Sequence, residues 1–160
     1  MTWKQAQISP DVSHHILNGE PLYSDRFDSV LAFHAPGISP VELNGEAWHI
    51  HLDGSPIYSP RFIRTFGFYE SLASVVSKDG WHHIRPNGTP LYDDRYSWCG
   101  NFQGGLCTVR NTDGSYYHIT INGKPAYTER WHYAGDFRDG VAVVQANDGY
   151  STHIDLNGNL

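Results

Sequence analysis

One short phrase recurs along the whole chain and constrains what it can fold into. The phrase begins with His-Ile and continues with a glycine, a proline, a tyrosine, an arginine and an aromatic residue in the same order. A fifth copy ends after its glycine. The histidines are His15, His49, His83, His118 and His153, which gives a period of 34 or 35 residues. A fixed period of this size indicates a repeat protein in which each unit is one small supersecondary element.

Two turn signals punctuate each unit. Asn-Gly or Asp-Gly follows every His-Ile pair, as in Asp53-Gly54, and from the second unit on another such dipeptide precedes the pair, as in Asp79-Gly80. These dipeptides accept the positive φ that tight hairpins need. Two turns between three short runs predict an antiparallel meander, made of a valine-ended strand, the His-Ile strand and a strand containing the proline and the tyrosine. We expect the link to the next unit to be irregular, and no segment predicts a helix.

The predicted fold is therefore all-β, a tandem array of four three-stranded antiparallel meanders of about 35 residues plus a partial fifth. The array is either a β-hairpin solenoid or a small propeller-like structure. A single domain is expected over 1–160. Its repeats are expected at about 13–46, 47–80, 81–115 and 116–150, with the partial unit over 151–160.

The two ends of the repeat array are incomplete. Residues 3–8 alternate in polarity, and we expect them to supply the partner strand that the first His-Ile strand otherwise lacks. The fifth His-Ile strand has no following Pro-x-Tyr strand, so an open array would leave a bare edge at 152–156. Bare edges pair with other chains. We expect the next repeat of a longer array to cover this edge. The alternatives are a closed ring, a following domain, or self-association through this C-terminal edge strand.

Composition narrows the partners and the compartment. The formal net charge is −6, and the four repeated arginines are spread one per unit, which argues against a nucleic-acid partner. No run of eighteen apolar residues and no signal peptide is present, so no membrane association is predicted. Two cysteines, Cys99 and Cys107, do not form a disulfide framework. A cytoplasmic, reducing setting fits this composition best.

The histidine column invites a metal-binding interpretation. Equivalent histidines lie one repeat apart, however, whereas metal ligands must converge on one ion. Side chains alternate along a strand, so His15 and Ile16 point to opposite faces. We expect each imidazole to bond a neighbouring loop in the same way in every unit, with metal binding or pH sensing as the alternative. No metal ligand is assigned.

The repeated Tyr-x-x-Arg-aromatic element also has two interpretations. Its arginines could grip a peptide, a sugar or an anion. They could instead lie on an aromatic ring or tie the link to the meander. The structural role is favoured, because a scaffold reuses the same residues in every unit whereas a binding site uses residues specific to one unit.

Aromatic residues at positions where the units differ are therefore the candidate ligand contacts. They are Trp48, Trp81, Trp98, Tyr116 and Tyr133. Exposed tryptophan and tyrosine anchor sugars and protein partners. The alternative is that these rings fill gaps between unequal units.

Catalytic signals are lacking in this sequence. Asp94, Glu129, Asp136 and Asp139 fall in links or turns without an arranged partner. There is no nucleophile elbow, no phosphate-binding loop and no dinucleotide fingerprint. We predict that the chain is not an enzyme, with no catalytic residue and no cofactor.

One stretch carries a family resemblance. Asp79-Gly80-Trp81-His82-His83-Ile84 through Pro90, followed by Phe102-Gln103-Gly104-Gly105-Leu106, resembles the WG-type β-repeat family, and looser matches extend over about 13–158. His82 departs from the family, which has glycine after the tryptophan. The resemblance implies a bacterial repeat array that acts as a scaffold and sometimes precedes a methyltransferase domain, although no methyltransferase signature is present here.

The predicted function follows from these observations. We expect a non-catalytic repeat scaffold that binds a protein or a small ligand and forms part of a larger bacterial protein. The alternative is a metal- or carbohydrate-binding, lectin-like array.

Overall fold

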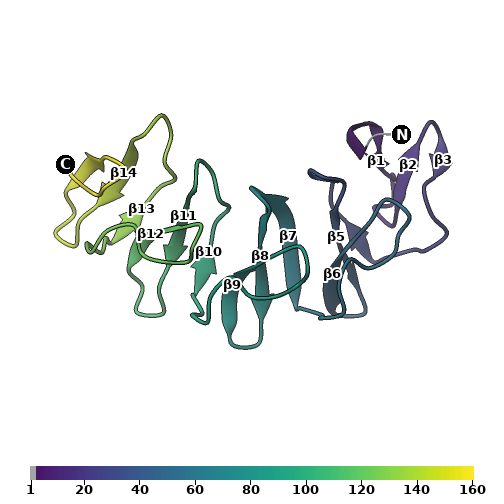
Figure 1. Ribbon diagram of the computed structural model, residues 1–160, viewed down its shortest axis with the longest axis horizontal. Coiled ribbons are helices and arrows are strands. Elements are labelled where there is room, and N and C mark those ends of the chain that lie inside the picture. The colour runs from purple at the N-terminus through teal and green to yellow at the C-terminus, as the bar shows by residue number, and fades with distance from the viewer. Residues whose placement is uncertain (1–2) are drawn as a thin grey trace.

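The computed structural model describes residues 3–160, which form five three-stranded antiparallel sheets in chain order (Figure 1). A short 3-10 turn, η1 (Trp3–Gln5), precedes them. The first sheet contains β1 (Gln7–Ile8), β2 (His15–Leu17) and β3 (Glu20–Pro21). The second contains β4 (Ser29–Val30), β5 (Ser39–Leu43) and β6 (Glu46–Ile50). The third contains β7 (Arg64–Tyr69), β8 (Leu72–Ser77) and β9 (Gly80–Ile84). The fourth contains β10 (Trp98–Cys99), β11 (Leu106–Arg110) and β12 (Tyr116–Thr120). The fifth contains β13 (Tyr133–Ala134), β14 (Ala142–Gln145) and β15 (Ser151–Ile154).

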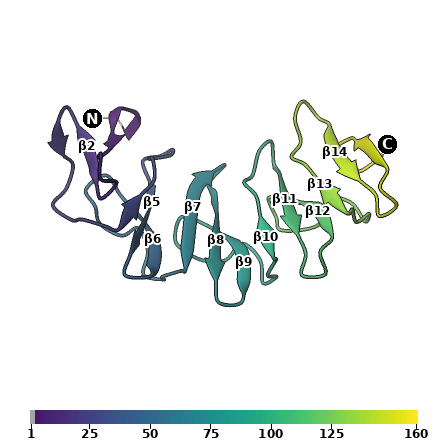
Figure 2. The same cartoon turned by 180° about the vertical axis from the view of Figure 1, so that it is seen from behind.

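The five sheets stand side by side in a curved, open row. Both views place the two ends of the chain at opposite ends of this row (Figures 1 and 2). Strands of the first and fifth sheets are not hydrogen-bonded to one another within residues 3–160. The array is therefore an open arc, and the predicted all-β tandem repeat is confirmed. Within the same described part of the chain, no helix is long and apolar enough to cross a membrane.

The prediction of the third strand was wrong from the second sheet on. The link that was expected to be irregular supplies the first strand of each of these sheets, as β10 does in the fourth. The Pro-x-Tyr segment makes only a single bridge, such as Ile84 with Pro90. Proline lacks the N–H that would continue a ladder. Because the link supplies its first strand, β13, the fifth sheet is three-stranded as well.

The N-terminal expectation is confirmed in part. Gln7 and Ile8 of β1 pair with Ile16 and His15 of β2, whereas Trp3–Gln5 form the 3-10 turn instead of a strand. At the other end, β15 forms the predicted edge. Self-association through that edge stays a prediction.

Apolar residues of the middle and third strands form the core. In the fourth sheet Cys107 lies opposite Ile119, and both side chains are buried. The repeated isoleucines of the later units are at most 1% exposed, namely Ile50, Ile84, Ile119 and Ile154. Ile16 is only half-buried, contrary to the expectation of equivalent sites, because no sheet precedes the first sheet within residues 3–160.

From the second unit on, the turn that follows the His-Ile strand packs on the tyrosine of the preceding unit. A Cβ atom added to Gly123 would lie 2.8 Å from the ring of Tyr92, and the φ of Gly123 is +77°. Gly54, Gly88 and Gly158 make the same approach to the preceding tyrosine. The glycine of the phrase therefore answers two needs, a left-handed backbone and close contact between neighbouring units.

Candidate functional site

The histidine column joins neighbouring sheets. The Nε2 atom of His83 lies 2.9 Å from the carbonyl oxygen of Gly100, beside β10 of the next sheet, and Nδ1 lies 2.6 Å from the hydroxyl of Tyr92. His15, His49 and His118 make the same pair of bonds, at 2.5–2.8 Å. The expectation that each imidazole bonds a neighbouring loop is confirmed for these four units.

This geometry assigns the protonation state of the rings. A carbonyl oxygen can only accept, so Nε2 carries the hydrogen and Nδ1 accepts from the tyrosine hydroxyl. Burial disfavours the imidazolium and lowers the pKa of His49 and of His83 to about 4. A phenylalanine packs on each ring, for example Phe102 with its centroid 4.8 Å from that of His83. These histidines are structural and neutral. The fifth, His153, is exposed.

The repeated arginines are structural too. In the fourth unit of the phrase, Arg130 donates to the carbonyl oxygens of Tyr127, Thr128 and Glu129, and its guanidinium lies 3.8 Å from the centroid of the Tyr117 ring. Arg26 and Arg61 donate to preceding carbonyls in the same way. Each of these arginines thus holds the loop that carries it, and together they form no shared ligand surface.

Two of the five candidate aromatic residues serve packing. Trp48 is 9% exposed, lies in the core edge-on to Phe27, and is covered by the guanidinium of Arg61 at 4.2 Å. Trp81 is half-buried and stacks on Phe66 with ring centroids 5.3 Å apart and planes 12° apart. Both rings are thus engaged in packing contacts within the array.

The other three candidates line one groove. Trp98 of β10, Tyr116 of β12 and Tyr133 of β13 surround a cavity of about 260 Å³ between the fourth and fifth sheets. Trp98 is 38% exposed and Tyr133 is 49% exposed. The ring centroids of Tyr116 and Tyr133 lie 5.3 Å apart, with planes tilted by 55°. We call this cavity the aromatic groove; its remaining lining residues are Thr108, Ala134, Gly135 and Asp136.

The aromatic groove also contains a polar pair that sequence reasoning missed. Thr108, 28 residues before Asp136, donates its hydroxyl hydrogen to Oδ1 of Asp136 at 2.5 Å. Asp136 is exposed, and Oδ2 has no hydrogen bond within residues 3–160. The guanidinium of Arg110 lies 5.9 Å from the centroid of the Tyr116 ring. The groove therefore combines apolar ring faces with a held carboxylate acceptor, which suits a ligand that has an apolar face and hydrogen-bond donors.

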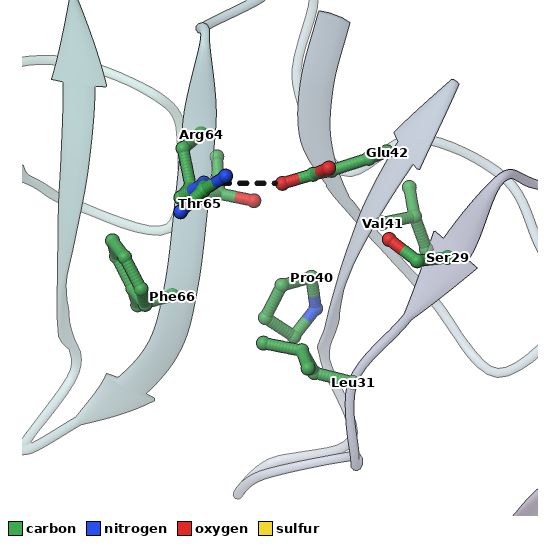
Figure 3. A pocket seen from close by; sticks show the side chains of 8 residues that line it. All are labelled: Ser29, Leu31, Pro40, Val41, Glu42, Arg64, Thr65 and Phe66. Atoms are coloured by element: carbon green, nitrogen blue, oxygen red, sulfur yellow. Dashed lines mark ion pairs between the residues drawn. The ribbon is translucent and has the colours of Figure 1, made fainter. Parts of the chain in front are cut away.

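The same junction two sheets earlier has different chemistry. Figure 3 shows the groove between the second and third sheets, where Glu42 and Arg64 face each other across the gap. Their ion pair measures 3.5 Å. In the repeat register Arg64 stands where Tyr133 stands in the fifth sheet, and Pro40 stands where Thr108 stands in the fourth sheet. The groove between the second and third sheets thus lacks the tryptophan and tyrosine lining of the aromatic groove.

Metal binding gains no support from the geometry. Within residues 3–160 no three His, Cys, Asp or Glu side chains converge closely enough to hold an ion. Both nitrogens of four column histidines are occupied by hydrogen bonds, as described above. Cys99 and Cys107 are buried free thiols, and burial raises the pKa of Cys99 to about 12, so neither is poised as a ligand or a nucleophile.

Comparisons with known proteins identify a fold rather than a family. No family model matches the chain, and no curated protein matches it significantly. The chain is similar to the computationally designed Ika8 protein, at 14% identity and a TM-score of 0.59, over 97% of this chain and 56% of that one. It is similar to BamB from Moraxella catarrhalis, at 11% identity and a TM-score of 0.57, over 100% and 61% of the two chains. Hsv2 from Kluyveromyces lactis matches at 10% identity and a TM-score of 0.57, over 97% and 61%.

The chain thus spans 56–61% of the length of these three proteins. At such low identities the likeness concerns the fold alone. The likeness agrees with the all-β repeat fold described above, a row of three-stranded antiparallel sheets.

Proposed function

We propose that this chain is a non-catalytic binding module and that the aromatic groove holds a segment of a protein partner. The observation that carries the proposal is the gathering of Trp98, Tyr116 and Tyr133 around one cavity. These rings come from three strands in two sheets, and they occupy positions that the repeat does not require. Tryptophan and tyrosine dominate the energetics of protein recognition. Repeat arrays present such residues on extended curved surfaces.

A carbohydrate ligand is the second candidate, and the Thr108–Asp136 pair favours it. Sugars offer an apolar ring face to an aromatic side chain and hydroxyl donors to a carboxylate. Oδ2 of Asp136 is free to accept such a hydroxyl, because only Oδ1 is bonded to Thr108. The WG-type resemblance agrees with a scaffold role and remains a family prediction.

The test uses defined probes on the full chain. A peptide array and a panel of soluble oligosaccharides are screened for binding, and hits are titrated by tryptophan fluorescence. The double variant Trp98→Ala/Tyr133→Ala is expected to lose at least about tenfold in affinity, since two aromatic anchors are removed. The matched control is Arg64→Ala, in the groove between the second and third sheets, where Arg64 occupies the position equivalent to Tyr133. This variant should bind as the parent chain does. Equal affinity of the double variant and the parent chain would refute the aromatic groove as the site.

A further inference from the structure

A carboxylate is held by a backbone turn at the junction between the third and fourth sheets. The side chain of Glu70, in the turn between β7 and β8, accepts hydrogen bonds from the N–H groups of Gly104 and Gly105. Each bond measures 2.9 Å, one to each carboxylate oxygen. Both glycines have positive φ, +60° and +80°, so their N–H groups are free of the hairpin ladder. Hydrogen bonds to an ionised acceptor are about twice as strong as neutral ones.

The fifth sheet repeats the turn. Arg138 and Val141 exchange backbone hydrogen bonds at 2.9 and 3.1 Å, as Gln103 and Leu106 do at 2.9 and 3.2 Å in the fourth sheet. The intervening Asp139 and Gly140 have φ of +52° and +80°, close to the values of Gly104 and Gly105. The N–H groups of Asp139 and Gly140 are therefore presented in the same way.

The carboxylate is missing at this second junction. In the repeat register Gly104 stands where Glu70 stands one unit earlier, and glycine has no side chain to offer. Within residues 3–160 the N–H groups of Asp139 and Gly140 have no hydrogen-bond acceptor, and the Arg138 guanidinium has no ion pair or hydrogen bond. A cavity of about 630 Å³ lies between the two turns, and we call it the turn cavity. Its lining residues are Gln103, Gly104, Leu106, Phe137, Arg138, Asp139, Gly140 and Leu156.

We propose that the turn cavity binds a carboxylate, supplied by an acidic side chain of a peptide. The N–H groups of Asp139 and Gly140 take the two oxygens, as the equivalent groups take Glu70. Arg138 supplies the positive charge, and Leu106, Phe137 and Leu156 contact the apolar stem of the ligand. The carboxylate of Asp139 opposes the ligand charge, so the site is weaker than it would be with glycine there. This site is separate from the aromatic groove, and either can fail without the other.

The direct test follows backbone amides by NMR in the full chain. The probe is an acetylated, amidated Gly-Glu-Gly peptide, and the matched control is the Gly-Gln-Gly peptide. Saturable shifts of the Asp139 and Gly140 amide resonances with the glutamate probe alone are expected. A third peptide with a free terminal carboxylate and no acidic side chain identifies the source; saturable shifts with that peptide alone would overturn the assignment to an acidic side chain.

Two variants make the inference sharper. Gly104→Glu places a carboxylate at the position of Glu70, where no atom lies within 4 Å of an added Cβ. This internal carboxylate is expected to fill the turn cavity and weaken the probe at least about tenfold, since it competes intramolecularly. Asp139→Gly removes the opposing charge and recreates the Gly-Gly turn, so it should tighten binding. The proposal is overturned if the parent chain and Asp139→Gly both show no saturable shift, or if Gly104→Glu binds the probe as the parent does.

Discussion

The Nδ1 atom of His83 lies 2.6 Å from the hydroxyl oxygen of Tyr92, the ninth residue after it. The same ring bonds the next sheet through Gly100, and Tyr92 receives the glycine turn of the following unit. Histidine, tyrosine and glycine of the repeated phrase therefore meet at every junction between sheets. These residues therefore recur because each sheet must pack on the next one, and not because they bind a ligand.

Removing one column histidine should destabilise the array. His83→Ala removes the side-chain partner of the Gly100 carbonyl and leaves the hydroxyl of Tyr92 with only a weak contact to Sγ of Cys99 at 3.6 Å. An unsatisfied buried group costs about 1–3 kcal/mol, and the lost imidazole also leaves a cavity. We expect a loss of about 2–5 kcal/mol in the free energy of unfolding, measured by urea denaturation. His153→Ala is the matched control, because His153 is exposed, and it should change stability by less than about 0.5 kcal/mol. Equal losses in the two variants would contradict the structural role of the column.

Stability should fall with acidification in a window set by the buried histidines. The pKa of His49, His82 and His83 is lowered to about 4, from an unfolded value of 6.5, because burial disfavours the charged ring. Between these values the unfolded chain binds more protons, so stability is complete above pH 6.5 and is lost as the pH falls toward 4. Each histidine contributes a slope of up to about 1.4 kcal/mol per pH unit. Urea midpoints measured from pH 7.5 to 4.5 check this, and a flat profile below pH 6.5 would refute it.

Substituting two glycines distinguishes the cost of backbone strain from the cost of a clash between neighbouring units. Gly19 and Gly123 have similar positive φ, +81° and +77°, but only Gly123 has a neighbour within 4 Å of an added Cβ. Gly19→Ala should cost about 1–2 kcal/mol for the left-handed backbone. Gly123→Ala should cost a further 1–3 kcal/mol, roughly, because the new methyl group meets the Tyr92 ring. Thermal unfolding of both variants measures the difference, and its absence would mean that the turn does not press on the tyrosine.

Truncating the repeated isoleucines should destabilise the protein to different extents, according to how deeply each side chain is buried. Ile84 is fully buried, and Ile84→Ala should lower the free energy of unfolding by about 2–5 kcal/mol. Ile16 is half-buried at the first sheet, so Ile16→Ala should cost clearly less. Chemical denaturation of the two variants side by side provides the measurement. A cost for Ile84→Ala below about 0.5 kcal/mol would remove it from the core.

Much of the fold was predictable because local signals repeat five times. The Asn-Gly and Asp-Gly turns, the buried isoleucines and the loop-bonding histidines all follow from their spacing. The first strand of each later sheet was missed. Trp98–Cys99 and Tyr133–Ala134 contain only two residues, too few to show alternation, and Arg64–Tyr69 is interrupted by Gly67 and a register shift. Pairing with the middle strand, which is a long-range contact, creates them.

The candidate site was predictable only as a set of residue types. Unit-specific aromatic residues were the correct signal for Trp98, Tyr116 and Tyr133, yet the same signal selected Trp48, whose position in the core depends on Phe27 and Arg61. The Thr108–Asp136 bond joins residues 28 apart, and the Glu70 contacts span 34 and 35 residues. A sequence pattern predicts which units are neighbours, but not which side chain reaches across a junction.

The aromatic groove is tested most directly by titrating the best-binding peptide or oligosaccharide into the parent chain and into Trp98→Ala/Tyr133→Ala. Isothermal calorimetry reports affinity, and a urea melt confirms that the variant is folded, as expected since Trp98 and Tyr133 are 38% and 49% exposed. The predicted result is a folded variant with affinity reduced at least about tenfold. A folded variant that binds as tightly as the parent would contradict binding in the groove between the fourth and fifth sheets.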